Sequence, residues 1–245
     1  MAEGPVYFLS DIHLGSKYDK EGDREKTFLG FLRSLPSNTE RIYLLGDVFD
    51  FWVEYRDVIP KGFTRIFGEL ARLADSGVEI IFFKGNHDYW IIDYFQKEIG
   101  IKVVDAPYKI EEIGGLRICI GHGDGLGLQS AKNRFIFSLF RNKFCISLLK
   151  SLHPRLIFDF ARGWSANSRK KHLKKPYHFR GESDTLYKFA EEIGSKEQID
   201  YYIFGHLHDR AEIAVSSGGR MFILDDWAEG ANYIRLDGDC ITLIA

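Results

Sequence analysis

Short apolar runs and longer amphipathic segments alternate along the first hundred residues. The apolar runs have lengths and compositions typical of buried β-strands, and they lie at 6–9, 41–45 and 78–84. Longer segments with apolar residues at helical spacing follow them, at 25–35, 63–77 and 88–100. Strands that alternate with helices in this way predict an α/β fold.

The pattern changes in the second half of the chain. The expected elements there are a hairpin around Gly114–Gly115, a helix at 183–194 and a further strand at 199–209. The tail after this strand predicts a meander of short antiparallel strands, with turns at SGG and DGD. The segment 125–180 shows helical patches joined by loops. We therefore expect one domain over 1–245, with 125–180 inserted into it as a helical lid.

The carboxyl ends of the predicted strands share one property. Five hydrophobic runs end in side chains that can bind a ligand, in the stretches SDIH, GDVFD, GNHD, GHGD and GHLH. In α/β sheets, ligands bind where the strands end. Residues two apart on an extended chain point to the same side, so each of the D-x-H and H-x-H pairs can serve one small site. The candidates are Asp11, His13, Asp47, Asn86, His122, His206 and His208.

Carboxylate, imidazole and amide-oxygen ligands together suit Mn, Fe or Zn better than an ion that prefers thiolates. Two metal ions about 3.5–4 Å apart need a shared ligand, and we expect Asp47 to be that bridge. The expected sets are Asp11, His13 and His208 for one ion, and Asn86, His122 and His206 for the other. Each residue alone is more typical of a turn or an ordinary core position, so the combination carries the prediction. Sharp turns out of the strands are expected at Gly46, Gly85, Gly121 and Gly205.

The bulk composition narrows the class of protein. With 245 residues, 45% of them hydrophobic and 28% charged, the chain resembles an ordinary soluble protein. No apolar run approaches the roughly 18 residues of a membrane span, and no cleavable signal precedes the first strand. The cysteines, Cys119, Cys145 and Cys240, form no CxxC pair, which is typical of a reducing compartment. We expect a cytoplasmic protein.

The net charge of −2 conceals an uneven distribution. Between 132 and 180 there are 13 lysines and arginines and a single acid, Asp159, so this stretch carries +12 and the remainder −14. Such asymmetry predicts that one surface meets an anionic partner. A merely solvated basic face is the alternative. The stretch is also rich in aromatic residues and leucine, however, which a solvated face does not need.

The segment 134–164 places its apolar residues between arginines and lysines, and it predicts two amphipathic helices broken at Pro154. A helix pair in the core is one interpretation. The other is a lid with an apolar inner face and a basic rim, which suits a substrate with acyl chains and phosphates taken from an anionic membrane surface. We expect no nucleic-acid partner, because the aromatic residues accompany aliphatic ones at helical spacing instead of forming exposed stacking platforms.

The strand-end stretches, taken in order, resemble those of the calcineurin-like metallophosphoesterase superfamily. The blocks D-x-H, GDxxD, GNHD, GH and GHxH follow one another between positions 11 and 208. The resemblance implies a four-layer αββα sandwich, in which two sheets pack face to face with helices outside. It also implies a dinuclear metal centre and an enzyme that hydrolyses phosphoesters or phosphoanhydrides.

The expected chemistry assigns roles to four residues beside the metals. Bound cations polarise the phosphoryl oxygens and lower the pKa of a bound water. His87 is expected to donate to a phosphoryl oxygen or to protonate the leaving group, and Asn86 to act as both ligand and substrate contact. Asp50 and Asp88 are expected to orient histidines, with plain turn roles as the alternative.

Longer stretches show a narrower resemblance, to the UDP-2,3-diacylglucosamine diphosphatases of lipid A biosynthesis. They are GDVFDFWVEYRD, GNHDYWIIDYFQKEIGI, GHGDGLG, ANSRKKH and LDDWAEGANYIRL, and they span nearly the whole chain. The resemblance implies hydrolysis of the diphosphate bond of UDP-2,3-diacylglucosamine, usually with Mn²⁺, to UMP and the diacylated sugar 1-phosphate. Mg²⁺, Fe²⁺ and Zn²⁺ remain open. The implied substrate contacts are Asn86, His87, Asn167, Ser168, Lys171, Lys175 and His206.

One departure from that family concerns His87, which stands where its best-known branch has arginine. The chain therefore resembles a diverged branch, peripheral to the cytoplasmic face of the inner membrane. One alternative is a soluble metallophosphoesterase that acts on another nucleotide pyrophosphate, a cyclic nucleotide or a phosphoprotein. Another is an inactive binding scaffold, but a scaffold would lack ligands and here all seven positions are filled. The oligomeric state leaves no mark in the sequence.

Overall fold

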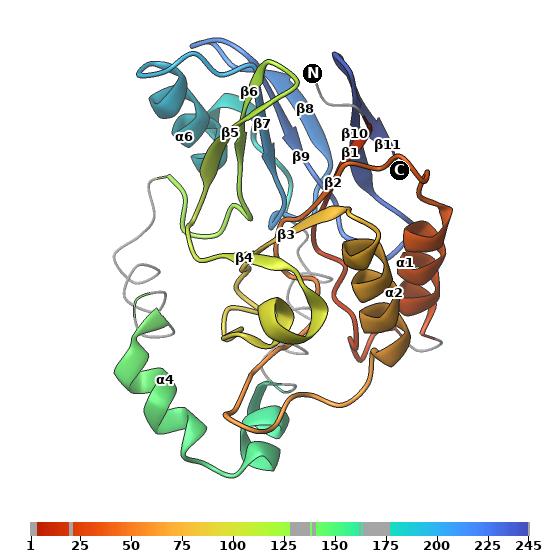
Figure 1. Cartoon of the computed structure of the whole chain (residues 1–245). Helices are drawn as coiled ribbons and strands as arrows, with labels where there is room; N and C mark the ends of the chain where they lie inside the picture. The colour runs from red at the N-terminus through yellow and green to blue at the C-terminus, as the bar shows by residue number, and fades with distance from the viewer. Residues whose placement is uncertain are drawn as a thin grey trace.

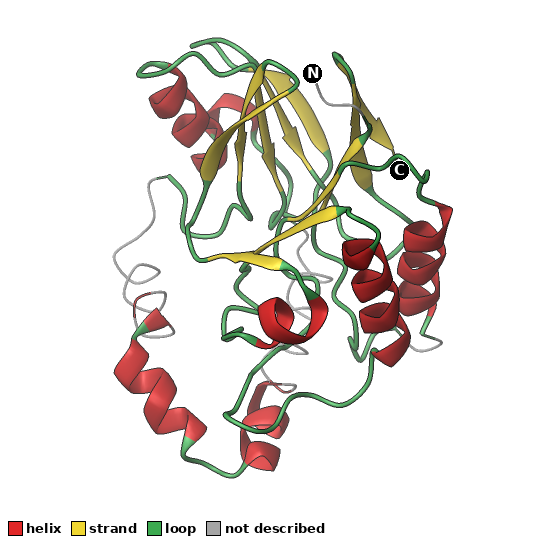
Figure 2. Cartoon of the chain, viewed as in Figure 1, coloured by secondary structure: helices red, strands yellow, loops and turns green. Residues whose placement is uncertain are grey.

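The structure, a computed structural model, describes residues 4–19, 22–127, 138, 141–161, 163 and 177–244. Two β-sheets lie face to face, and helices cover their outer faces (Figure 1). Figure 2 shows the same layers by secondary structure. The predicted αββα sandwich is confirmed. Its helical elements are α1 (Asp23–Ser34), α2 (Thr64–Asp75), the π-helix η1 (Phe95–Ile99), α4 (Lys143–Lys150), the 3-10 helix η2 (Gly181–Ser183) and α6 (Thr185–Gly194).

The first sheet consists, in order, of β11 (Cys240–Ile244), β10 (Tyr233–Asp237), β1 (Val6–Leu9), β2 (Arg41–Leu44), β3 (Glu79–Phe83) and β4 (Lys102–Val104). Strands β1 to β4 pair in parallel, as expected where helices separate consecutive strands. The hairpin β10–β11 pairs antiparallel to the free side of β1.

The second sheet consists, in order, of β5 (Lys109–Ile113), β6 (Leu116–Ile120), β7 (Tyr201–Phe204), β9 (Arg220–Ile223) and β8 (Ala211–Ala214). The predicted hairpin about Gly114–Gly115 is confirmed as β5–β6. Strand β7 lies in the centre, parallel to both β6 and β9.

Residue alternation along the central strands produces the layers. On β1, Val6 and Phe8 point between the two sheets, where they pack with residues such as Ile203. Tyr7 and Leu9 point the other way, into the cluster that α1 and α2 cover. The second sheet repeats this arrangement, because its outer face packs against α6. Both faces of the central strands are therefore apolar, and the polar residues lie beyond the strand ends.

The tail does not form the single meander that its turns predict. Strands β8 and β9 form one antiparallel hairpin in the second sheet, and β10 and β11 form another in the first. The chain crosses between the sheets over residues 224–232. Local turn signals identify hairpins, but they do not specify the sheet that each hairpin joins.

The helix predicted at 88–100 is confined to the π-helix η1. The buried carboxylate of Glu54 explains the difference. It accepts hydrogen bonds from the backbone N–H groups of Ile92, Asp93 and Tyr94 at 2.8, 2.9 and 3.2 Å. A side chain distant in sequence thus satisfies the donors that begin this turn, and the residues before them adopt an irregular conformation.

The described part of the 125–180 segment contains α4 and a second helical stretch at 154–161, which begins at the predicted break, Pro154. The second stretch docks on the main domain, because Ile157 and Phe158 pack with Val53, Phe51 and Trp90. Figure 1 shows α4 lying away from both sheets. Among the described residues, no helix is both long and apolar enough to cross a membrane.

Candidate metal centre

The predicted ligands lie just beyond the ends of five strands, β1, β2, β3, β6 and β7. These strand ends belong to both sheets, and the face-to-face packing brings their side chains together. Asp11, His13, Asp47 and His122 are buried, with at most 1% of their surface exposed. The remaining predicted ligands are more accessible, namely Asn86, His206 and His208.

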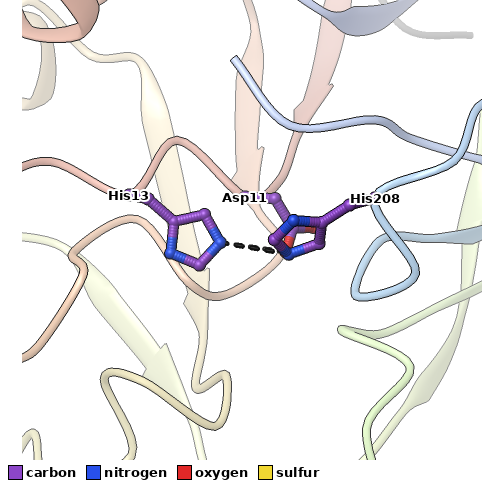
Figure 3. Close-up of side chains that lie close together, drawn as sticks. All are labelled: Asp11, His13 and His208. Carbon is purple, nitrogen blue, oxygen red and sulfur yellow. Dashed lines mark hydrogen bonds and ion pairs between the residues drawn. The ribbon is translucent and has the colours of Figure 1, made fainter. Parts of the chain in front are cut away.

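Asp11, His13 and His208 form one compact group (Figure 3). Oδ1 of Asp11 lies 3.1 Å from Nε2 of His208 and 3.5 Å from Nε2 of His13. The two Nε2 atoms are 3.2 Å apart. Three potential donor atoms from β1 and β7 thus converge on one point, as the sequence predicts for one of the two metal sets.

Asp47 lies between this group and the other predicted set. Its Oδ2 is 3.4 Å from Nε2 of His122 and 3.9 Å from Nε2 of His13. Nε2 of His87 is also 3.9 Å away, although the sequence assigns that residue a proton-transfer role and not a ligand role. The central position of this carboxylate is the one that a shared ligand requires.

The second predicted set is assembled less tightly. Nε2 of His122 lies 3.3 Å from Oδ1 of Asn86, and the ring centroids of His122 and His206 are 5.1 Å apart. His206 belongs to none of the three described His and carboxylate groups whose donor atoms lie within 4.8 Å of one another. Its backbone N–H nevertheless donates to Oδ2 of Asp11 at 2.8 Å, which ties the two halves of the site together.

Hydrogen bonds orient the rings. Nδ1 of His122 donates to the carbonyl of Leu45 at 2.9 Å, and Nδ1 of His87 donates to the carbonyl of Asp50 at 2.7 Å. Both rings therefore direct Nε2 into the site, the arrangement typical of metal-binding histidines. The Asp50 side chain was expected to orient a histidine, and its Oδ1 lies 3.8 Å from Nδ1 of His13.

The side chain of Asp88 binds backbone N–H groups. Its carboxylate accepts hydrogen bonds from the N–H groups of Gly85 and Val48 at 2.8 Å, Asp47 at 3.2 Å and Phe49 at 3.4 Å. The sequence assigns it to orient a histidine, whereas these contacts join the loops after β2 and β3. Burial, with a contribution from Asp47, raises the pKa of Asp88 to about 7 despite the donated hydrogen bonds.

The backbone is strained at the site. Of the six non-glycine residues with positive φ in the described chain, five are predicted ligands: Asp11, His13, Asp47, His206 and His208, with φ between 51° and 70°. The left-handed conformation costs an L-residue roughly 1–2 kcal/mol. Such strain persists only where the surrounding structure holds it, and it concentrates at functional sites.

The predicted role of the four glycines is right for one of them. Only Gly46, with φ of 92°, has the left-handed conformation of a sharp turn. The others permit close approach, because a Cβ at Gly85 or Gly205 would lie 2.2 Å from a carboxylate oxygen of Asp47 or Asp11. At Gly121 it would lie 2.5 Å from a backbone carbonyl oxygen.

The charges of the site reinforce one another. Burial raises the pKa of Asp11, but His208, His13 and His122 together outweigh burial and hold the pKa well below its usual range. The pKa of Asp47 is lowered in the same way, chiefly by His122 against burial. Burial opposes the charged form of His122, but the surrounding carboxylates, Asp47 first among them, together outweigh burial and raise the pKa of His122. Burial and the His122 charge together lower the pKa of His206.

The residues fit a divalent cation. Oδ1 of Asp11 is fully buried and makes no hydrogen bond within the described chain, although Nε2 atoms surround it. An orphaned carboxylate oxygen is costly unless a cation completes its surroundings. Carboxylate oxygen and imidazole nitrogen are together the donor set of Mn, Fe and Zn sites.

Two residues beside the centre, Arg24 and Asp226, were not predicted from the sequence. Nη2 of Arg24 lies 2.9 Å from Oδ2 of Asp226, and that same oxygen lies 3.8 Å from Nδ1 of His208. Arg24 is 7% exposed, which is rare for an arginine. Burial raises the pKa of Asp226, but Arg24, His208 and the N–H of Ala228 together outweigh burial, so the net shift is downward. The DDW stretch near the C-terminus was a signal for Asp226, whereas nothing in α1 distinguished Arg24.

Four predicted substrate contacts, Asn167, Ser168, Lys171 and Lys175, lie outside the described residues.

The chain is similar to known proteins along most of its length. The family described as Calcineurin-like phosphoesterase matches residues 4–210. The UDP-2,3-diacylglucosamine hydrolase of Porphyromonas gingivalis is 36% identical over 97% of this chain and 96% of its own length. The hydrolase of the same name from Neisseria meningitidis serogroup A is 30% identical over 96% of this chain and 95% of its own length. A dimetal phosphatase structure from Danio rerio superposes with a TM-score of 0.47 at 13% identity, over 99% of this chain and 96% of that chain. Since the family match covers most of the chain and the bacterial relatives span nearly all of it, the protein belongs to the calcineurin-like phosphoesterases.

Proposed function

We propose that the protein hydrolyses the diphosphate bond of UDP-2,3-diacylglucosamine, giving UMP and 2,3-diacylglucosamine 1-phosphate. The observation that carries the reaction class is the pair of overlapping groups Asp11, His13, His208 and Asp11, Asp47, His122, in each of which the donor atoms lie within 4.8 Å of one another. The substrate follows from the bacterial relatives, which bear the name UDP-2,3-diacylglucosamine hydrolase.

The family implies divalent metal ions, and the described chain holds three candidate groups for them. We assign Asp11, His13 and His208 to one ion, Asn86, His122 and His206 to the other, and Asp47 to both. Two Mn²⁺ ions held by these residues would polarise the phosphoryl oxygens and lower the pKa of a bound water.

His87 is the group we assign to proton donation. Its Nδ1 proton is committed to the carbonyl of Asp50, so the ring must carry a second proton to donate from Nε2. That proton would go to a phosphoryl oxygen or to the leaving group. Asn86, His87 and His206 are more accessible than the buried ligands, so we place the substrate on their side.

The 125–180 segment is proposed to act as a lid over this side. Nη2 of Arg141 lies 3.0 Å from Oδ2 of Asp124, two residues beyond His122. The guanidinium of Arg141 also lies 4.5 Å over the ring of Tyr89, in the stretch that follows His87. The segment thus touches both loops that carry predicted catalytic groups. We assign sugar and phosphate contacts to Asn167, Ser168, Lys171 and Lys175.

Exposed apolar residues on the same segment support a lipid substrate. On α4, Phe144 is 77% exposed and Leu148 63%. On the next helical stretch, Leu156 and Phe160 are each 60% exposed. A soluble surface gains nothing from such residues, whereas acyl chains and a bilayer interface would cover them. We therefore propose that the enzyme works at the cytoplasmic face of the inner membrane, where its basic segment meets anionic lipid.

The test is UMP release by purified protein with Mn²⁺. We expect turnover of UDP-2,3-diacylglucosamine and little turnover of UDP-N-acetylglucosamine, which lacks the two acyl chains. The His122→Ala variant should lose activity by roughly 10³-fold, because several kcal/mol of charge stabilisation depends on the metals. Equal turnover of the two sugar nucleotides would contradict the lipid substrate and favour a soluble nucleotide pyrophosphatase.

Membrane association is tested separately by sedimentation with lipid vesicles. We expect binding to anionic vesicles that weakens with added salt, because ions screen the basic surface. Binding to neutral vesicles should be weaker. Absence of binding to anionic vesicles at low salt would contradict the membrane proposal while leaving the hydrolytic one intact.

A further inference from the structure

The Arg24–Asp226 ion pair joins two parts of the chain that are 202 positions apart. Arg24 lies in the first turn of α1, and Asp226 lies in the connection that carries the chain from β9 to β10, across the two sheets. Arg24 is 7% exposed, and the Asp226 side chain is 16% exposed. A shielded arginine–carboxylate pair of this kind holds its geometry better than a surface pair.

The guanidinium of Arg24 also reaches the loop after β1. Nη1 donates to the carbonyl of Ile12 at 3.0 Å, while Nη2 donates to Asp226 at 2.9 Å. Ile12 stands between Asp11 and His13, both of which have the left-handed backbone conformation. The Arg24 side chain therefore holds the strained turn, which contains two of the predicted ligands, through a hydrogen bond to its backbone.

The same connection contacts this turn a second time. The backbone N–H of Trp227 donates to the carbonyl of Asp11 at 3.3 Å. The Trp227 ring is buried against Phe28 and Phe31 of α1, with centroid distances of 5.6 and 5.8 Å. The position of Asp226 is thus set by the core beneath α1 and not by the site alone.

The oxygen of Asp226 that accepts from Arg24 also faces the third predicted ligand of this group. This oxygen, Oδ2, lies 3.8 Å from Nδ1 of His208, whose Nε2 points at Asp11. A carboxylate behind the outer nitrogen of a metal-binding histidine orients the ring and strengthens it as a donor. Arg24 and Asp226 together thus touch all three members of the Asp11, His13 and His208 set, directly or through the turn.

From this geometry we infer that the Arg24–Asp226 pair is a positioning device for one metal site only, the one formed by Asp11, His13 and His208. The inference rests on the proposed metal centre and adds a prediction of selectivity. Asn86 and His122 contact each other, and His122 also donates to the carbonyl of Leu45, whereas His206 reaches the first set only through its backbone N–H, which donates to Oδ2 of Asp11. We therefore expect the second ion to depend on the pair much less than the first. Both residues act through the ligands and contact no reacting atom.

The experiment is a Mn²⁺ titration of the full chain, followed by calorimetry and by electron paramagnetic resonance. Wild type should bind two ions and show the spectrum of a coupled pair. Asp226→Asn keeps the shape and removes the charge, so one ion should bind about 10–100-fold more weakly while the other keeps its affinity. At Mn²⁺ concentrations between the two dissociation constants, the spectrum should be that of an isolated ion. Arg24→Gln should weaken the same ion.

A matched control removes a similar ion pair far from the site. Nε of Arg41 lies 2.6 Å from Oε2 of Glu79 at the starts of β2 and β3, the opposite ends of the strands from the ligands. Glu79→Gln should keep both ions at wild-type affinity, whatever its effect on unfolding temperature. If Arg24→Gln fails to fold, the nearly isosteric Asp226→Asn still decides the question.

The outcomes separate the two proposals. If wild type binds two ions and Asp226→Asn binds both with unchanged affinity, the positioning role is overturned and the metal centre stands. If Asp226→Asn weakens both ions equally, the selectivity is overturned. If wild type binds no Mn²⁺, the metal centre itself fails, and the inference fails with it.

Discussion

The metal centre and the 125–180 segment differ from ordinary protein cores and surfaces in opposite ways, because one buries charged groups and the other exposes apolar ones. The centre buries carboxylates and histidines, including Asp11 and Asp47, and strains the backbone beneath them. The described helices of the segment expose large apolar side chains, such as Phe144 and Leu148. Neither the buried charges of the centre nor the exposed apolar side chains of the segment stabilise the folded state. A bound cation would offset the cost of the buried charges, and an apolar phase would offset the cost of the exposed apolar surface.

The two regions also differ in how they are held. Hydrogen bonds and close backbone approaches lock the centre from several strands at once, as at Gly85 and Asp88. The described segment instead rests on a few apolar contacts, of which Phe51 with Phe158 is one, and on the Arg141–Asp124 ion pair. Changes in the centre should therefore alter both chemistry and stability, whereas changes on the exposed face of the segment should alter binding alone.

The largest effect is expected from Asp47→Asn. The variant keeps the shape of the shared carboxylate but removes its charge, so activity should fall by roughly 10³-fold. Asp93→Asn, which removes a carboxylate paired on the surface with Lys97, is the control and should keep wild-type activity. Initial rates of UMP release measure both variants. A fall of less than tenfold for Asp47→Asn would contradict its place between the two ions.

Metal removal should destabilise the protein next most strongly. A cation that binds only the folded state, at a free concentration 100 times its dissociation constant, contributes about 2.7 kcal/mol per site. Thermal unfolding with a chelator, and then with excess Mn²⁺, measures the difference. We expect a lower unfolding temperature with the chelator that Mn²⁺ restores. An unfolding temperature that changes with neither the chelator nor Mn²⁺ would count against a metal centre.

Gly85→Ala should follow, at roughly 1–3 kcal/mol of lost stability, because a new Cβ would collide with Asp47 and force it to move. Gly68→Ala is the matched control. Gly68 lies in α2, nothing stands within 4 Å of its added Cβ, and the change should stabilise the helix by about 0.5–1 kcal/mol. Chemical denaturation measures both. Equal effects of the two variants would show that the loop beside Asp47 is not tightly packed.

The smallest effect on stability is expected in the segment. A Phe144→Ser, Leu148→Ser double variant should change the free energy of unfolding by no more than about 0.5 kcal/mol, since both side chains are mostly exposed. Sedimentation with anionic vesicles should nevertheless fall clearly below that of wild type. Loss of stability with unchanged vesicle binding would reverse the contrast between the two regions.

The amino-acid sequence was sufficient to predict the layers and the residues that we propose for the site. Apolar alternation on short strands dictates which side chains face the core, and this local property survives in β1, β2, β3 and β7. The polar residues that end each strand were visible for the same reason. Parallel strands align their carboxyl ends, so Asp11 and Asp47, which follow β1 and β2, had to come together once the first sheet formed. His122 follows β6 in the other sheet and joins them only because the two sheets pack face to face.

The remaining features could not be predicted from local sequence, because they depend on partners that are far away in the chain. The carboxylate of Glu54 accepts hydrogen bonds from N–H groups about 40 positions away, and only η1 of the predicted helix at 88–100 forms. The last two hairpins join different sheets. Arg24 and Asp226 meet across 202 positions, and no local pattern marks either of them as half of a pair. Local sequence specifies which way a side chain points, whereas the packing of the whole chain specifies what it meets there.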